Sequence, residues 1–350
     1  MYDQSAMRAQ AELYHQYFLG LQLMVAVNEP AALTEKWMFR LFRRQHEEKF
    51  LSSFAKLGLD GLPDAVACAQ YHVLSNSIGG VAVEYAYERD DKAWVRFRYP
   101  RWMYDGAVIC GIPVESSRGV LRGWYAHNGV SLQNPRLGFV CVSEDMTGQY
   151  GLCGYFKEYA HDLSSIQRLQ FAPHERPAKF DPEQQPVPPA HQWSDERLAK
   201  AHLNYAMEYV RNGVRALVAE LGQERAMQLC HRAARLTGLQ HFNRMALEVG
   251  AGVEAEIIDG GGPSAAADFM LTLWAGIGET CQLSVLSEHA VQIQQRGIRL
   301  VRGLPLAERH ALLSCCVELW RGTLQAQREL MQLDARIHSD GEGIDWAITG

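Results

Sequence analysis

The sequence predicts an α+β protein built from two similar units, each with an antiparallel sheet and packed helices, that form a pseudo-dimer within one chain. The first observation is that the order helix, two strands, helix, two strands occurs twice along the 350 residues. The second is a segment over residues 171–193 that holds six of the 13 prolines and separates the two occurrences. Proline fixes φ and lacks a backbone donor, so we expect this segment to be an extended linker without regular structure.

The first unit is expected over residues 63–170, after a helical region over residues 1–62. Apolar residues alternate over 81–88 and again over 93–99, on either side of a turn at Asp90-Asp91, and this pattern predicts a hairpin. The other expected elements are a helix over 63–79, a helix over 114–129, and strands over 137–144 and 152–159. Together they predict a small sheet with helices on one face.

The second unit is expected within residues 194–350, where a long helical region runs from 195 to about 249. Its further elements are a helix over 264–278 capped by Ser264, strands over 281–288 and 291–301, a helix over 305–329, and strands over 330–339 and 343–349. An Ile-Gly pair ends the first helix of each unit, and a tryptophan lies in each second helix. These landmarks are Ile78-Gly79, Ile277-Gly278, Trp124 and Trp320. The shared order predicts an internal duplication.

The helix over 305–329 carries an apolar stripe at heptad spacing. Its members are Leu306, His310, Leu313, Val317, Trp320 and Leu324. A stripe of this kind is typical of a core or a subunit interface. We therefore expect the second unit to serve as scaffold and dimerisation surface of a homodimer, with the polar site in the first unit.

The overall composition excludes several classes of function. With 34 Lys and Arg against 40 Asp and Glu, the chain lacks the basic surplus of a nucleic-acid-binding protein. No apolar run is long enough to span a bilayer, and the N-terminus lacks the pattern of a signal peptide, so we expect a cytoplasmic protein without membrane contact. None of the eight cysteines forms a CxxC pair, which favours small buried hydrophobes in a reducing compartment.

No metal site is predicted from the spacing of possible ligands. Four histidines, His72, His127, His202 and His241, could meet around a metal ion in the folded chain, although their separations follow no known pattern. We predict no cofactor, and the sequence leaves a metal or haem open.

Two arginines on the strand over 93–99 are candidates for substrate binding. Arg96 and Arg98 share one face of this strand with Trp94. A guanidinium group binds a carboxylate through paired hydrogen bonds, so the pair indicates a small anionic substrate; the alternative is a solvated sheet face. Arg118 and Arg122 follow Glu115 along one helix surface, where salt bridges are the simpler interpretation.

The helix over 114–129 presents one face toward the interior. Ser117, Val120, Leu121, Trp124 and His127 recur at three- and four-residue steps and form this face. His127 could act as general acid or base, with Trp124 and the neighbouring Asn128 lining the same pocket. The alternative is a buried histidine whose hydrogen bonds are satisfied within the fold.

Cys110 is the candidate nucleophile. It lies in a glycine-flanked loop just before the helix over 114–129, where the helix dipole lowers a thiol pKa. A nucleophilic pair of Cys110 and His127, oriented by Asp105, is chemically feasible. The alternative is that Cys110 only packs.

The first unit resembles a known family in the order of its parts. The segments that carry the resemblance lie within residues 28–159; they are "FLSSFAKLGL", "WVRFRYP", "ICGIPVESSRGVLRGW", "QNPRLGFVCVSE" and "GLCGYF". This region is similar to the L-2-amino-thiazoline-4-carboxylic acid hydrolase domain family. The resemblance implies a cytoplasmic hydrolase that opens a C–N bond in a small heterocyclic or amidine-like carboxylate.

Three functions follow from these residues. In the hydrolase, the arginines hold the carboxylate, Cys110 or a water activated by His127 attacks, and Asp105 or Glu115 steers protons. The alternative is a sensor or carrier that binds a small molecule in the same pocket without chemistry. A third interpretation is a haem or redox protein in which His127 or His310 is a haem ligand, although no CxxCH motif is present. A catalyst should bring Cys110 and His127 within hydrogen-bonding reach beside a cavity, and a sensor should not.

Overall fold

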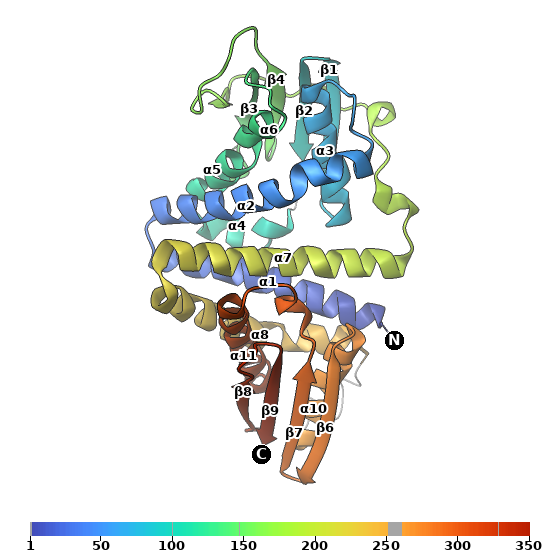
Figure 1. Cartoon of the computed structure of the whole chain (residues 1–350), viewed down its shortest axis with the longest axis vertical. Helices are drawn as coiled ribbons and strands as arrows, with labels where there is room; N and C mark the ends of the chain where they lie inside the picture. Colours follow the sequence, from blue (N-terminus) through green and yellow to red (C-terminus); the bar gives the residue numbers. More distant parts are fainter. Residues whose placement is uncertain (1, 100, 147, 251–260, 328) are drawn as a thin grey trace. The chain divides into compact units, whose positions relative to one another are not determined.

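The computed structural model describes residues 2–99, 101–146, 148–250, 261–327 and 329–350, and Figure 1 shows its elements. The chain divides into two compact units. Unit 1 comprises residues 1–24 and 195–350, and unit 2 comprises residues 25–194. The N-terminal region expected over residues 1–62 is thus shared: most of its first helix belongs to unit 1, and the rest of the region belongs to unit 2.

Unit 2 contains a five-stranded sheet and its packed helices. The last turn of α1, which spans Gln4–Asn28 as a whole, belongs to this unit. The other helices are α2 (Ala31–Leu57), α3 (Asp64–Ile78), α4 (Val108–Gly111), α5 (Val114–Gly123) and α6 (Asn128–Ser131). The 3-10 turns are η1 (Trp102–Tyr104), η2 (Tyr125–His127), η3 (Pro182–Gln184) and η4 (Pro189–Gln192). The strands are β1 (Val83–Arg89), β2 (Lys92–Phe97), β3 (Leu137–Ser143), β4 (Cys153–Glu158) and β5 (Leu169–Phe171). Their order is β1-β2-β4-β3-β5, and only the β3–β5 pair is parallel.

The helix expected over 114–129 ends earlier, at Gly123, and the chain continues as η2 and α6. The cause is a close crossing with α2. A Cβ at Gly123 would lie 2.7 Å from the Phe39 carbonyl oxygen. At this crossing Arg43 donates from Nε and Nη2 to the carbonyl oxygens of Gly123 and Arg122, at 3.0 and 3.2 Å. Because a side chain of α2 satisfies these terminal carbonyls, the helix ends there without a further turn.

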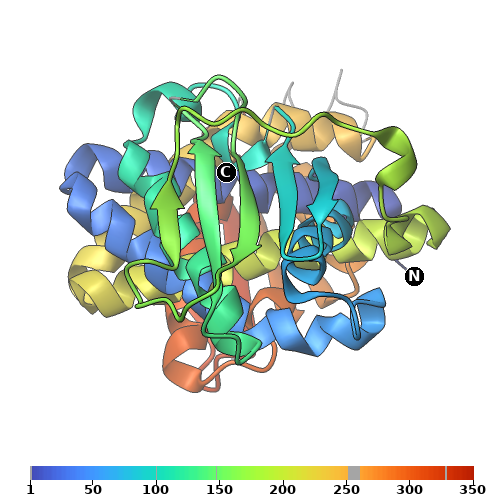
Figure 2. The same ribbon diagram turned by 90° about the horizontal axis from the view of Figure 1, so that it is seen from above.

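The segment over 171–193 belongs to unit 2 and is more ordered than expected, since it begins in β5 and contains η3 and η4. It packs along the outer face of the sheet (Figure 2). The side-chain amide of Gln185 pairs with the backbone of Tyr85 on edge strand β1, accepting from its N–H at 2.9 Å and donating to its carbonyl at 2.7 Å. The glutamine thus covers part of an open strand edge.

Unit 1 contains a four-stranded antiparallel sheet in the order β6-β7-β9-β8. Besides α1, its helices are α7 (Asp195–Leu221), α8 (Gln223–Glu248), α10 (Gly262–Gly276) and α11 (Leu306–Gln325), with the 3-10 turn η5 (Arg299–Val301). The strands are β6 (Thr280–Ser287), β7 (Ala290–Arg296), β8 (Gln332–Ile337) and β9 (Gly343–Thr349). Ser264 lies inside α10 rather than capping it.

The two units repeat one architecture, as the element order predicted. The neighbours in β1-β2-β4-β3 correspond to those in β6-β7-β9-β8. The pair α8 and α11 crosses like α2 and α5: a Cβ at Gly322 would meet the Arg235 carbonyl, as one at Gly123 would meet Phe39. The chain is therefore an α+β protein with an internal structural repeat. Of the heptad stripe on α11, the last four members are buried in the core of unit 1, whereas Leu306 is exposed.

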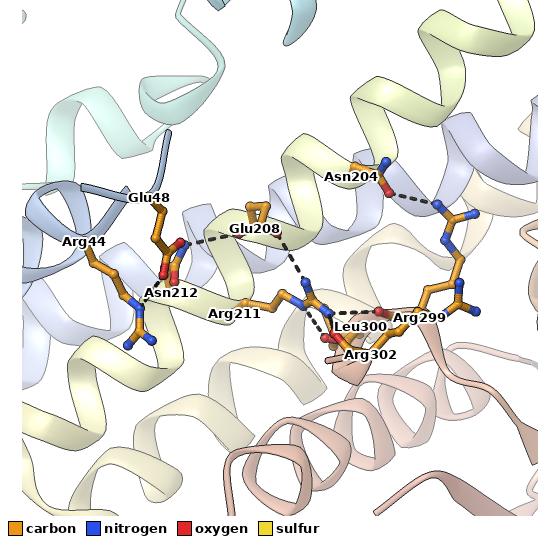
Figure 3. A network of polar contacts seen from close by, with 9 residues as sticks. All are labelled: Arg44, Glu48, Asn204, Glu208, Arg211, Asn212, Arg299, Leu300 and Arg302. Atoms are coloured by element: carbon orange, nitrogen blue, oxygen red, sulfur yellow. Dashed lines mark hydrogen bonds and ion pairs between the residues drawn. The ribbon is translucent and has the colours of Figure 1, made fainter. Parts of the chain in front are cut away.

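The connection from β7 to α11 is anchored by arginines of unit 1 (Figure 3). Arg211 on α7 donates from Nη2 to the carbonyl oxygens of Arg302 at 2.6 Å and Arg299 at 3.2 Å. Arg299 in turn donates to Asn204 Oδ1 at 2.8 Å. The Arg299 carbonyl also accepts the Arg302 N–H within the turn, at 3.2 Å, so the Arg211 bonds add side-chain anchors to this connection. Across the described parts of the chain, no helix is both long and apolar enough to cross a membrane.

Candidate functional site

The predicted arginine pair lies on the outer face of the unit 2 sheet and shares a single carboxylate. Arg96 and Arg98 both donate to Glu84, at 3.4 and 3.2 Å. Trp94 donates from Nε1 to Glu88 at 2.7 Å. Beside them is a cavity of about 20 Å³, lined by residues that include Glu84, Trp94, Arg96 and Phe180. It has room for roughly one water molecule, so substrate binding by this pair stays a prediction.

The predicted nucleophile makes no described hydrogen bond to its predicted partners. Cys110 belongs to the separate short helix α4, not to a loop, and its side chain is exposed. Asp105 is also exposed. Within the described residues, no hydrogen bond joins Cys110, His127 and Asp105, and none joins Glu115, in the first turn of α5, to them. The catalytic group of Cys110, His127 and Asp105 therefore stays a prediction.

Three other predicted residues come together with a histidine that the sequence did not single out. The Nε2 atom of His46, in the middle of α2, lies 3.0 Å from the Oδ1 atom of Asn128. Its ring is edge-on to the rings of Trp124 and His127, each with centroids 5.1 Å away, and it stacks on Phe50 at 4.5 Å. The buried spacing of Phe42, His46 and Phe50 along α2 was the signal that could have identified it.

A third histidine extends this group into the core. His72 on α3 stacks on Tyr125 at 4.4 Å and on Phe156 at 5.7 Å, and its ring centroid lies 6.4 Å from that of Trp124. Tyr71 bridges Phe50 and Trp124 within the same aromatic packing. We call His46, His72, Trp124, His127 and Asn128 the histidine cluster of unit 2.

Burial keeps the imidazoles of the cluster neutral. It lowers the pKa of His46 and of His72 to about 3, with smaller contributions from neighbouring histidines and arginines. It lowers the pKa of His127 to about 4, and the nearby charges of Arg43 and Arg168 act in the same direction. Near pH 7 each ring therefore presents one N–H donor and one nitrogen acceptor. Burial also raises the pKa of the Cys68 thiol beside Asn128 far above its usual value, so that thiol is neutral too.

Several buried polar atoms of this region lack hydrogen-bond partners. Among the described residues these include His46 Nδ1, His72 Nε2, Trp124 Nε1 and Arg168 Nη1. Native proteins leave few such atoms, and a bound water, ion or ligand is one explanation for those that remain. No group of three or more His, Cys, Asp or Glu side chains in the described ranges is arranged to hold a metal ion. The unpaired atoms thus mark a site for hydrogen bonding rather than for metal coordination.

Unit 1 has an apolar residue at the position equivalent to His46. Gly123 approaches the Arg43 N–H, and Gly322 approaches that of Leu239. Arg43 and Leu239 are therefore equivalent, and three residues further along the two helices His46 corresponds to Phe242. The Phe242 ring packs edge-on against Phe269, with ring centroids 5.3 Å apart. The core of unit 1 continues with Trp274, stacked against Trp346 at 5.2 Å. The polar side chain of His46 is therefore a feature of unit 2 within an architecture that both units share.

The comparisons with known proteins add no relative. No family model, curated protein or solved structure matches the chain. The resemblance of residues 28–159 to a hydrolase family stays a prediction.

Proposed function

We propose that this protein binds a small molecule as a sensor or carrier, without converting it, and that the histidine cluster of unit 2 is the binding site. The observation that carries the proposal is the pair of buried, unpartnered nitrogens, His46 Nδ1 and His72 Nε2. A buried polar atom without a partner costs about 1–3 kcal/mol. A ligand that pairs with these nitrogens recovers part of this cost.

The surroundings of these nitrogens suit a ligand. Phe50, Tyr71 and Tyr125 supply aromatic walls, and the amide of Asn128 fixes the orientation of the His46 ring. Sites for small molecules combine such apolar walls with a few fixed polar groups. His127 is only half-buried, so it lies on the side from which a ligand would enter.

The protonation behaviour of the cluster favours binding over catalysis. A general base works best when its pKa lies near the working pH, whereas burial holds the pKa values of His46 and His127 at about 3 and 4. The predicted nucleophile, Cys110, is exposed and makes no described contact with the cluster. Neutral imidazoles in this setting serve as hydrogen-bonding groups.

The test is a ligand screen by thermal denaturation, using aromatic compounds together with cyclic amidines, ureas and amides. We expect ligands that raise the melting temperature of the wild-type protein to lose this effect in His46→Phe. The control His310→Phe changes a histidine of unit 1 and should keep it. Chromatography of the same mixtures detects ring opening. Turnover that disappears in Cys110→Ala would instead establish the hydrolase, and an undiminished shift in His46→Phe would exclude this site.

A further inference from the structure

The rim of the histidine cluster carries two arginines. Arg43 reaches the end of α5 through its bonds to the Arg122 and Gly123 carbonyls, directly before Trp124. Arg168 packs against Gly129, the residue after Asn128: a Cβ on this glycine would lie 2.9 Å from Arg168 Nη1. Both positive charges act on the half-buried ring of His127. The outer end of the cluster is thus cationic, whereas its buried end is uncharged.

Unlike several others of the same unit, these two arginines form no described ion pair, although the charge of Glu47 acts on Arg43. In the described part of unit 2, neither Arg43 nor Arg168 forms an ion pair, and Arg168 Nη1 is buried without a hydrogen bond. Several other arginines of this unit are paired, as in Arg101–Asp145, Arg118–Glu144, Arg122–Glu35 and Arg136–Glu158. A buried guanidinium nitrogen without an acceptor is costly, so an anion is the expected partner.

We propose that the ligand of this cluster is an aromatic carboxylate, whose carboxylate binds Arg168 and Arg43 and whose ring lies among His127, His46 and Trp124. This inference rests on the proposed function. The carboxylate lies outward because the charged groups are at the half-exposed rim, and the ring lies inward because the buried imidazoles are neutral. A planar carboxylate matches the fork of a guanidinium group, and edge-on and stacked rings are already the packing mode of the cluster.

The experiment compares acids with their isosteric amides. Benzoate, nicotinate and indole-3-acetate are titrated calorimetrically against benzamide, nicotinamide and indole-3-acetamide at pH 7.5 and low ionic strength. We expect at least one acid to bind about tenfold more tightly than its amide, because the amide lacks the charge that the arginines recognise. This preference should weaken as salt is added.

The variants separate the arginine from the rest of the site. Arg168→Gln should lower acid affinity about tenfold and leave amide affinity unchanged, and Arg168→Lys should restore part of the loss. Arg136→Gln, at an ion-paired arginine of the same unit, is the matched control and should bind like the wild type. Circular dichroism melting identifies a variant that fails to fold, in which case Arg43→Gln supplies the same comparison.

The outcomes are distinguishable. If amides bind as tightly as acids and His46→Phe abolishes both, the proposed function stands and the carboxylate inference is overturned. Equal loss in Arg168→Gln and Arg136→Gln would also overturn it. If no acid or amide binds and no compound of the wider screen stabilises the protein, the proposed function itself fails.

Discussion

His46 and His127 face each other edge-on in the interior of unit 2, with ring centroids 5.1 Å apart, although 81 positions separate them in the chain. Asn128, next to His127, completes the link through its 3.0 Å contact with His46. The break of α5 at Gly123 makes this arrangement, because it turns Trp124, His127 and Asn128 toward α2. Four predictions follow from this cluster and from the architecture around it.

The buried histidines should make the protein sensitive to acid. Their pKa of about 3 in the folded state lies below the unfolded value near 6.5, so the unfolded chain binds more protons and stability falls as the pH drops below 6.5. For His72 the loss is about 2 kcal/mol at pH 5. Urea unfolding at pH 5 and pH 7 should show His72→Phe gaining stability relative to the wild type mainly at pH 5. His310→Phe is the control, and an equal gain at both pH values would contradict the assignment.

In unit 1, Glu279 should give stability the opposite pH dependence. Burial raises its pKa to about 7, so the folded state binds the extra proton between about pH 4.5 and 7, and stability falls as the pH rises through this window. Its carboxylate accepts from Gln295 at 2.6 Å and from the Arg299 backbone at 2.8 Å. Glu279→Gln removes the titration, so the stability of the variant relative to wild type should rise from pH 5 to pH 8. Exposed Glu288→Gln should show no such trend.

The helix crossings should be intolerant of a methyl group. Gly322→Ala and Gly123→Ala place a Cβ against backbone of the facing helix, which cannot move as a side chain can. We expect each to lose about 1–3 kcal/mol of stability. Only Gly123→Ala should also weaken ligand binding, since Arg43 lies at that crossing. Gly297→Ala, where φ is +67° and no atom is near, measures the cost of backbone strain alone.

Gln185 should protect the edge of β1. Gln185→Ala removes both bonds to Tyr85, so amide hydrogen exchange at Tyr85 should accelerate and stability should fall by about 1–2 kcal/mol. The neighbouring Gln184→Ala removes one longer bond, of 3.3 Å to Tyr87, and should have a smaller effect. Similar exchange in both variants would show that Gln185 has no special role at this edge.

The sequence predicted most elements because their signals are local. The alternation of apolar residues on either side of Asp90-Asp91 predicted the β1–β2 hairpin, and the order of elements predicted the repeat. The end of α5 at Gly123 was predicted wrongly, because Arg43 on a distant helix provides the carbonyl donors that end it. The order within residues 171–193 was missed for the same reason, since Gln185 gains its partner only when the sheet has formed.

The site was predicted in part. His127, Trp124 and Asn128 were identified from one amphipathic stretch, but His46 and His72 lie on other helices and meet it only through tertiary packing. The sequence pattern favoured Arg96 and Arg98, which lie close together in sequence but share Glu84 in the fold, and it did not indicate the arginines near the cluster. Charge density along a chain does not reveal which guanidinium groups have partners after folding.

The division of α1 from the rest of unit 1 has a topological consequence. Residues 1–24 and 195–350 form one compact unit, so unit 2 is an insertion between the first helix of its host and the remainder. Unit 2 can be expressed as one continuous stretch, whereas unit 1 needs its two pieces rejoined. A protease cut near residue 194 would leave α1 attached to unit 1 by packing alone, held by contacts such as the 2.7 Å bond from Gln10 to the Leu273 carbonyl.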